Sequence, residues 1–192
     1  MARRKFSFGP SMRITAGNLK GRVITGPEGL SVRPTGSKMR QAFFNIISNN
    51  IEGARFVDVC AGSGLMGFEA LSRGARSLVF IEKDKRQGLA IQQNIKRLDL
   101  LGCAEVITGD LRRVLPVLPA EDADIIFADP PYQSELATVI LILVDTHDLL
   151  AADGFLAIEH ALDTKLPQQS GRLANYDFRK YGQSAFSFFA RG

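Results

Sequence analysis

The sequence predicts an α/β protein whose central sheet is parallel and is covered by helices on both faces. Three observations predict this class. From residue 55 onward, short apolar runs alternate with segments of helical periodicity. The first run leads into a glycine-rich turn over residues 62–67. Regular alternation of strands and helices is typical of parallel sheets, because a helix connects each strand to the next. The hydrophobic fraction of 45% and the charged fraction of 23% are those of an ordinary globular protein.

The N-terminal part follows a different pattern from the rest of the chain. Residues 12–15 and 22–25 alternate apolar and polar side chains around a glycine-containing turn, which predicts a small hairpin. Apolar side chains then recur at helical spacing over residues 39–47, and Thr35 or Ser37 is expected to cap this helix. We therefore predict a basic extension, a hairpin plus a helix, over residues 1–52 and a main domain over residues 53–192.

The main domain continues with strands and helices in alternation. Buried-type apolar runs predict strands at residues 56–60, 78–82, 105–108, 123–128 and 154–159, and two final strands at 176–180 and 184–189. Helical spacing predicts helices at residues 65–73, 85–98, 111–118 and 135–145.

The net charge of +4 hides an asymmetry along the chain. Residues 1–40 hold one acid, Glu28, against nine basic residues, a balance of +8, so the remaining residues, with 15 basic and 19 acidic side chains, carry −4. A basic arm on a mildly acidic body is typical of a protein that acts on a polyanion, and the alternative is a tail kept soluble by charge. The basic residues are Arg3, Arg4, Lys5, Arg13, Lys20, Arg22, Arg33, Lys38 and Arg40.

Acidic side chains stand at or near the ends of successive predicted strands. They are Asp58, Glu82, Asp110 and Asp129. Ligands of an open parallel sheet bind outside the carboxyl ends of its strands, so these acids are expected to share a site. The glycine turn and Glu82 would also suit a dinucleotide enzyme, but several carboxylates would repel a pyrophosphate and attract a cationic cofactor such as S-adenosylmethionine. The alternative is that the acids only cap helices.

Each acid of this predicted cofactor site has an expected role. Asp58 would accept hydrogen bonds from the ammonium group, directly or through water, Glu82 from both ribose hydroxyls, and Asp110 from the adenine amino group. Two glycines would let the backbone approach the methionine end without an intervening Cβ. The predicted site comprises Asp58, Ala61, Gly62, Gly64, Glu82, Lys83, Asp110 and Leu111.

The tetrapeptide Asp129-Pro130-Pro131-Tyr132 is the predicted catalytic segment. A conjugated exocyclic amine is a poor nucleophile unless acceptors hold its hydrogens, and the Asp129 carboxylate and the Pro130 carbonyl are such acceptors. Successive prolines fix the backbone of the turn, and Tyr132 offers a ring for base stacking. The alternative is a plain turn that ends a strand.

Other classes of protein are disfavoured. Two cysteines, Cys60 and Cys103, do not make a disulfide framework, and with two histidines they do not suggest a metal site. The predicted catalytic segment is a proline turn and not a cysteine-bearing loop, so methyl transfer through a covalent cysteine intermediate is not expected. Both cysteines are interpreted as packing residues. No signal sequence or membrane span is evident, so we expect a cytoplasmic protein with no membrane partner.

Nearly the whole chain, from about Met12 to Phe189, resembles the bacterial 16S ribosomal RNA guanine-N2 methyltransferases. The residues that carry the resemblance are Met12 to Gly17, Arg33-Pro34-Thr35, Arg40, Phe44-Asn45, Asp58 to Gly64, Glu69 to Ala75, Glu82-Lys83-Asp84, Gly109-Asp110 and Asp129 to Tyr132. One departure is that residues 36–41 lack the two acids usual in the family, although Arg40 is retained.

The resemblance implies a Rossmann-like, seven-stranded methyltransferase sheet, mostly parallel, with an antiparallel strand from the C-terminal hairpin. It implies that the cofactor is S-adenosylmethionine, and that the substrate is the N2 of a guanine in 16S ribosomal RNA or the assembled small subunit. Two alternatives are an adenine-N6 methyltransferase of DNA or RNA and a non-catalytic RNA-binding assembly protein that keeps the cofactor pocket. The residues expected to contact RNA are Arg13, Lys20, Arg22, Arg33 and Arg40.

Overall fold

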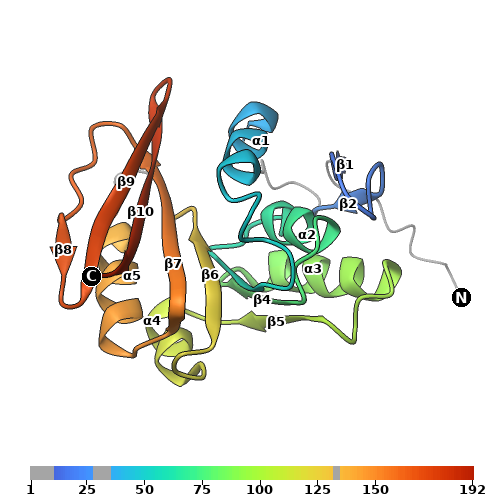
Figure 1. Ribbon diagram of the computed structural model, residues 1–192. Coiled ribbons are helices and arrows are strands. Elements are labelled where there is room, and N and C mark those ends of the chain that lie inside the picture. The colour runs from blue at the N-terminus through green and yellow to red at the C-terminus, as the bar shows by residue number, and fades with distance from the viewer. Residues whose placement is uncertain (1–10, 28–35, 132–134) are drawn as a thin grey trace, which may run out of the picture.

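The computed structural model describes residues 11–27, 36–131 and 135–192 (Figure 1). The predictions for Arg33, Thr35 and Tyr132 lie outside the described residues, as does the basic run at residues 3–5.

The main element is an eight-stranded sheet with the order β5-β4-β3-β6-β7-β10-β9-β8. The first five strands of this order run parallel, whereas β10 is antiparallel to both of its neighbours, β7 and β9. The strands are β3 (Arg55–Val59), β4 (Ser77–Glu82), β5 (Ala104–Thr108), β6 (Ala123–Ala128), β7 (Leu150–Ala161), β8 (Gln169–Ser170), β9 (Leu173–Tyr181) and β10 (Ser184–Arg191). The predicted mostly parallel sheet with an antiparallel C-terminal strand is therefore confirmed.

Two strands differ most from the prediction. The two-residue strand β8 is an eighth strand that the sequence pattern did not predict, since its only support is its pairing with β9. Strand β7 begins at Leu150 rather than at Gly154, because its pairing with β6 continues across an irregularity between Ala123 and Ile125. Both differences depend on pairing with a neighbour, which leaves no periodic signal in the strand itself.

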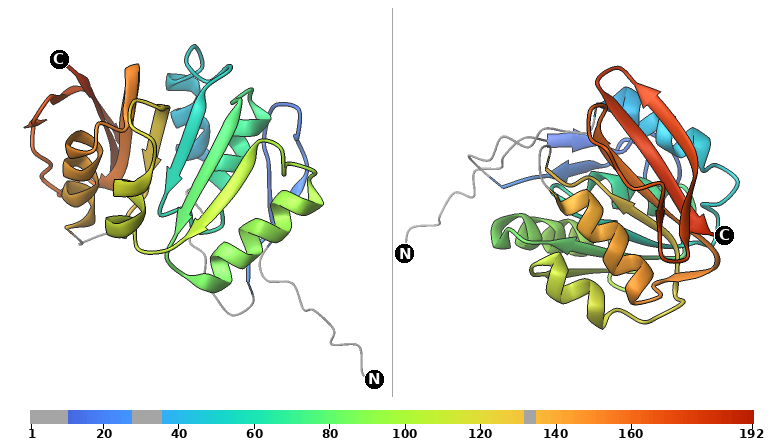
Figure 2. Two further views of the ribbon diagram at one scale, coloured as in Figure 1. Left: turned by 90° about the horizontal axis from the view of Figure 1, so that it is seen from below. Right: turned by 90° about the vertical axis from the view of Figure 1, so that its left-hand side faces the viewer.

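Helices cover both faces of the sheet (Figure 2). One core cluster joins the sheet to α1, α2 and α3, and a second joins its opposite face to α4 and α5. The helices are α1 (Ser37–Ile46), α2 (Leu65–Ser72), α3 (Lys85–Arg97), α4 (Leu111–Val114) and α5 (Leu136–Thr146).

Two predicted helix details are wrong. The helix expected at residues 111–118 ends as α-helix at Val114 and continues as a 3-10 turn over Leu115–Val117, because Pro116 has no backbone N–H to donate. The cap of α1 is Gly36, with no side-chain hydrogen bond, and Ser37 lies inside the helix instead of capping it.

The N-terminal hairpin, β1 (Ser11–Arg13) and β2 (Val23–Thr25), packs against α2 and α3 rather than standing apart. Gly17, in its turn, has φ +77°, and a Cβ there would lie 1.6 Å from the carbonyl oxygen of Ser72, so only glycine allows this approach. Ile14 and Ile24 are buried in the same cluster as the sheet.

The buried acid Glu69 of α2 binds residues of the N-terminal extension. Glu69 has no exposed surface, and its Oε1 accepts hydrogen bonds from the N and Oγ1 of Thr15, both at 2.6 Å. The guanidinium groups of Arg40 and Arg73 each lie 3.2 Å from a Glu69 oxygen. A buried charge is tolerated only when it is paired in this way, so the pairing fixes how the hairpin and α1 sit on α2.

Candidate functional site

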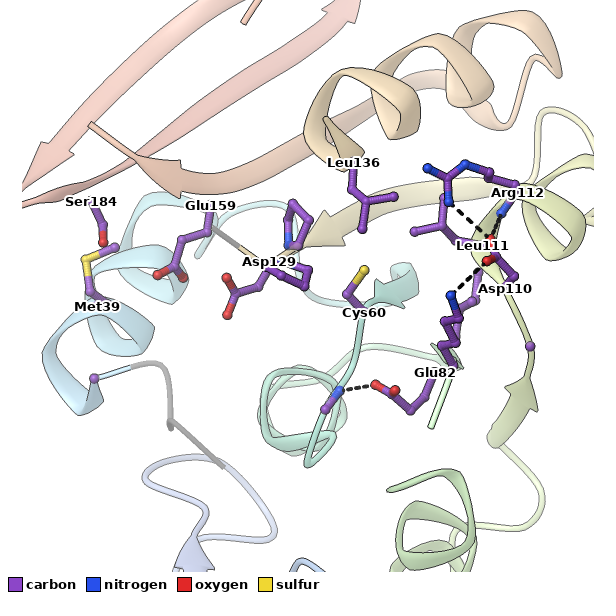
Figure 3. Close-up of a pocket in the computed structure, with 17 residues that line it drawn as sticks. Met39, Cys60, Glu82, Asp110, Leu111, Arg112, Asp129, Leu136, Glu159 and Ser184 are labelled. Carbon is purple, nitrogen blue, oxygen red and sulfur yellow. Dashed lines mark hydrogen bonds and ion pairs between the residues drawn. The ribbon is translucent and has the colours of Figure 1, made fainter. Parts of the chain in front are cut away.

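A cavity of about 590 Å³ opens at the carboxyl ends of the parallel strands (Figure 3). This volume is within the usual range for small-molecule sites. The residues that line it are Gly36, Met39, Cys60, Gly62, Ile81, Glu82, Lys83, Gly109, Asp110, Leu111, Arg112, Asp129, Pro130, Pro131, Leu136, Glu159 and Ser184.

Four of the lining residues occupy one row across the sheet. Val59 pairs with Ile81 of β4 and with Ala128 of β6, and Ala128 pairs with Ile158 of β7. The residue that follows each of these four paired positions lines the cavity. Because neighbouring strands are about 4.8 Å apart, these lining residues lie next to one another. The row in spatial order is Glu82, Cys60, Asp129 and Glu159.

Glu82 holds the glycine turn in place. Its Oε2 accepts a hydrogen bond from the Gly62 N–H at 2.7 Å, and its Oε1 accepts one from the Asp84 N–H at 2.8 Å. Gly62 has φ +55°, and a Cβ there would meet nothing within 4 Å. Because Gly62 faces open space in the cavity, its backbone has room for a ligand, and the predicted contact with the methionine end stays a prediction.

Gly64 and Ala61, both predicted to bind the cofactor, are not among the described residues that line the cavity. A Cβ at Gly64 would lie 3.0 Å from the Phe80 ring and 3.1 Å from Ile91, so the glycine is needed for packing beneath the turn. Ala61 packs against the core and donates its N–H to the Ile81 carbonyl at 3.1 Å. The two residues therefore support the turn from beneath, and their contact with the cofactor stays a prediction.

Asp58 lies deeper than predicted. It is within β3, two residues before Cys60, and only 2% of it is exposed. Its Oδ2 accepts a hydrogen bond from the Gly67 N–H of α2 at 2.9 Å. Burial raises the pKa of its carboxyl well above the usual value, and the charges of Asp129 and Glu82 add to this effect. Asp58 therefore orients α2 beneath the pocket and is not on its wall.

Asp110 caps a helix and also lines the cavity, so the structure excludes neither of the roles that the sequence left open. Its carboxylate caps α4 by accepting a hydrogen bond from the Arg112 N–H at 3.0 Å, and it also lines the cavity beside Leu111. Lys83 Nζ lies 3.2 Å from Asp110 and the Arg112 guanidinium lies 3.7 Å away. The backbone hydrogen bond from Arg112, followed by Lys83, lowers the pKa of the Asp110 carboxyl.

The proline turn begins where β6 ends. Asp129, Pro130 and Pro131 line the cavity, and the Asp129 N–H donates to the Val59 carbonyl at 3.3 Å, which continues the pairing with β3. Cys60 faces Asp129 from the neighbouring strand end. The described part of the predicted catalytic turn and two of the predicted cofactor acids, Glu82 and Asp110, are thus brought to one cavity.

Cys60 is a pocket residue, which corrects its interpretation as packing only. It has φ +62°, a conformation that is strained for a residue with a side chain. Burial, followed by the charges of Glu82 and Asp129, raises the pKa of its thiol to about 12. The thiol is therefore protonated at neutral pH and is a poor nucleophile.

The sequence did not identify three lining residues on the side of Asp129 that lies away from Glu82. Glu159 ends a strand that was predicted, so the strand-end rule applied to the other acids would have found it. Met39 and Ser184 come from α1 and β10, and their contribution depends on packing that no local pattern reveals.

The predicted RNA-contacting residues separate into two groups. Arg13, Lys20 and Arg22 are exposed on the hairpin. Arg40, by contrast, is only 4% exposed and forms the buried ion pair with Glu69. The prediction that Arg40 contacts RNA is therefore wrong, because packing of α1 onto α2 turns its side chain inward.

The described residues contain neither a metal-binding cluster nor a helix that could span a membrane. Within residues 11–27, 36–131 and 135–192, no group of three or more His, Cys, Asp and Glu side chains is placed to hold a metal ion. No helix in the described part of the chain is long and apolar enough to cross a membrane. Cys60 and Cys103 are both free thiols.

The chain matches the family described as Conserved hypothetical protein 95 over residues 12–190. Ribosomal RNA small subunit methyltransferase D of Escherichia coli K12 is 30% identical over 182 residues, covering 94% of this chain and 90% of that protein. The solved structure of the Escherichia coli protein yhhF has a TM-score of 0.84 at 29% identity and covers 95% of this chain and 98% of that one. An RNA methyltransferase from Salinibacter ruber, in complex with S-adenosyl-L-homocysteine, has a TM-score of 0.62 at 14% identity, over 81% and 91% of the two chains.

The strand order and these likenesses define the class: the fold is that of the Rossmann-like methyltransferases. The chain belongs to the Conserved hypothetical protein 95 family, which its match over residues 12–190 shows. The fold class and the resemblance inferred from the sequence are both confirmed.

Proposed function

We propose that this protein transfers a methyl group from S-adenosylmethionine to the exocyclic N2 of a guanine in 16S ribosomal RNA. One observation carries the proposal: a row of strand-end residues places the Asp-Pro-Pro turn and the acid Glu82 in one cavity. The 30% identity to a small-subunit ribosomal RNA methyltransferase supports the choice of substrate.

The pocket residues fit a cationic cofactor. Of the described lining residues, the acids are Glu82, Asp110, Asp129 and Glu159, whereas the only cations, Lys83 and Arg112, both pair with Asp110. S-adenosylmethionine, when bound, supplies a methyl group activated by a sulfonium. Glu82 and Gly62 would hold its ribose and methionine portions, and Asp110 with Leu111 would lie at the adenine.

Asp129 acts on the substrate amine in this proposal. As the new nitrogen–carbon bond forms, the carbon–sulfur bond breaks and its electron pair neutralises the sulfonium. The amine nitrogen then has one proton in excess, which it loses. The Asp129 carboxylate accepts a hydrogen bond from the amine, turns its lone pair toward the methyl group and can hold that proton. Such positioning can supply roughly 7–11 kcal/mol of the barrier.

The N-terminal extension over residues 1–52 is the proposed RNA-contacting part, and residues 53–192 are the proposed methyltransferase domain. Arg13, Lys20 and Arg22 support this division, because their exposed guanidinium and ammonium groups suit phosphate contacts. The expected substrate form, free ribosomal RNA or the assembled subunit, is in the cytoplasm.

The experiment is methyl transfer from labelled S-adenosylmethionine to 16S ribosomal RNA, small subunits and DNA in parallel. We expect label in RNA or in subunits and, after nuclease digestion and mass spectrometry, N2-methylguanosine at one position. Label only in N6-methyladenosine would favour the adenine alternative. No transfer to any substrate, with cofactor binding retained, would favour a non-catalytic assembly protein.

A further inference from the structure

Glu159 stands beside the proposed catalytic acid. Ala128 of β6 pairs with Ile158 of β7, so the residues that follow, Asp129 and Glu159, are neighbours across one strand spacing. Figure 3 shows both carboxylates directed into the same part of the cavity, on the side away from Asp110. Only 3% of the surface of Glu159 is exposed, so the surrounding protein holds its side chain in place.

This end of the cavity is rich in hydrogen-bond acceptors and has no cation among its described lining residues. The pocket cations, Lys83 and Arg112, lie at the opposite end against Asp110. Met39 from α1 and Ser184 from β10 lie next to Glu159 at this end of the cavity (Figure 3). The group that enters here must therefore present several donors side by side.

Purines differ in this respect. The Watson–Crick edge of guanine carries the N1–H and the N2 amine, which are adjacent donors, whereas adenine places the N1 lone pair next to its amine. With Asp129 at the reacting amine, a second carboxylate one strand away would meet the N1 position. That contact is favourable for an N1–H and repulsive for a lone pair.

We propose that Glu159 is the specificity-determining residue of this site, accepting a hydrogen bond from guanine N1–H and excluding bases that carry a lone pair there. This inference rests on the proposed function and deepens it, because it assigns the choice of guanine over adenine to one side chain. A carboxylate held beside the N1 position attracts an N1–H and repels a lone pair, so it discriminates against bases that lack this donor.

The test replaces the methylated guanosine, once mapped, by 2-aminopurine riboside in 16S RNA joined from two pieces. 2-Aminopurine keeps the reactive 2-amino group but has a lone pair at N1. We expect the wild-type protein to show a kcat/KM for 2-aminopurine lower by roughly 10-fold or more than for guanine. Equal values for the two bases would overturn the proposal without any variant.

The variant arm uses Glu159→Gln, whose amide can donate to the N1 lone pair. We expect the ratio of kcat/KM for guanine to kcat/KM for 2-aminopurine to fall by roughly 10-fold or more relative to the wild type, with cofactor affinity unchanged. The matched control, Ser184→Ala at the same end of the pocket, should keep the wild-type ratio. A ratio unchanged in Glu159→Gln would overturn the proposal.

Failure of the proposed function has a different result. If the wild-type protein methylates no guanine in RNA or subunits, the proposed function fails before the ratio is measured. If guanine is methylated and the ratio does not respond to Glu159, only the specificity role fails. Should Glu159→Gln lose its fold, seen as loss of cofactor binding, Glu159→Asp replaces it: because it keeps the acceptor, it should retain a preference for guanine, and loss of that preference would count against the proposal.

Discussion

The two ends of the pocket use carboxylates differently. At the end of Glu82 and Asp110, each carboxylate accepts backbone N–H groups, and Asp110 is further paired with two cations. At the end of Asp129 and Glu159, no described lining residue is basic. We therefore propose separate tasks for these similar acids: the first pair, oriented by the backbone, binds the cofactor, and the second offers acceptors to a reacting base.

The largest expected effect is at the base end. We expect Asp129→Ala to lower the single-turnover rate of methyl transfer by roughly 10²–10⁴-fold, because the amine loses the acceptor that orients it. The affinity for S-adenosylmethionine, measured by calorimetry, should stay within about twofold. An unchanged rate would remove Asp129 from its assigned role and the distinction between the two ends with it.

Glu82→Gln should give the opposite pattern. One amide atom would become a donor facing the N–H of Gly62 or Asp84, so the turn loses its support. We expect the dissociation constant of the cofactor to rise roughly 10–100-fold, as for loss of a charged hydrogen bond. The transfer rate at saturating cofactor should remain near that of the wild type. A rate loss with unchanged affinity would show that the two ends do not divide their tasks.

The exposed hairpin lies outside both ends and should affect only RNA binding. We expect the triple change Arg13→Gln, Lys20→Gln and Arg22→Gln to weaken RNA affinity by about tenfold at low salt. Each lost phosphate contact should flatten the logarithmic salt dependence by about 0.7–0.9. Filter binding at several salt concentrations measures this, with the exposed Lys165→Gln as the control. If the salt dependence of RNA affinity were unaltered, the hairpin charges would serve solubility and not RNA binding.

The smallest effect concerns stability. The raised pKa of Asp58 means that the folded state holds its proton more tightly than the unfolded state, whose carboxyl has a pKa near 4. Wild-type stability should therefore fall as pH rises from about 4 through the folded pKa. Asp58→Asn keeps an acceptor for the Gly67 N–H and removes this loss. We expect its melting temperature to exceed that of the wild type by about 2–4 °C at high pH. The difference should vanish below pH 4, and a difference that grew with acidity would contradict this account.

Local pattern predicted most of the elements near the site. The strands before Asp129 and Glu82 were visible as apolar runs, and Asp129 and Glu82 stand where predicted at the carboxyl edge. The same pattern could not show that Asp58 and Gly64 lie beneath the cavity wall. A strand-end acid can face a ligand or a helix N–H, and a glycine can make room for a ligand or for a ring such as that of Phe80.

The sequence by itself determined the α/β class, the parallel strands and the turn at Asp129, because these depend on periodicity and on short segments of chain. Only the tertiary structure decided that Arg40 is buried against Glu69 and that Glu159 stands beside Asp129. The physical reason is that strand order and helix packing join residues far apart in the chain, and side chains of the same type acquire their roles from the neighbours they meet there.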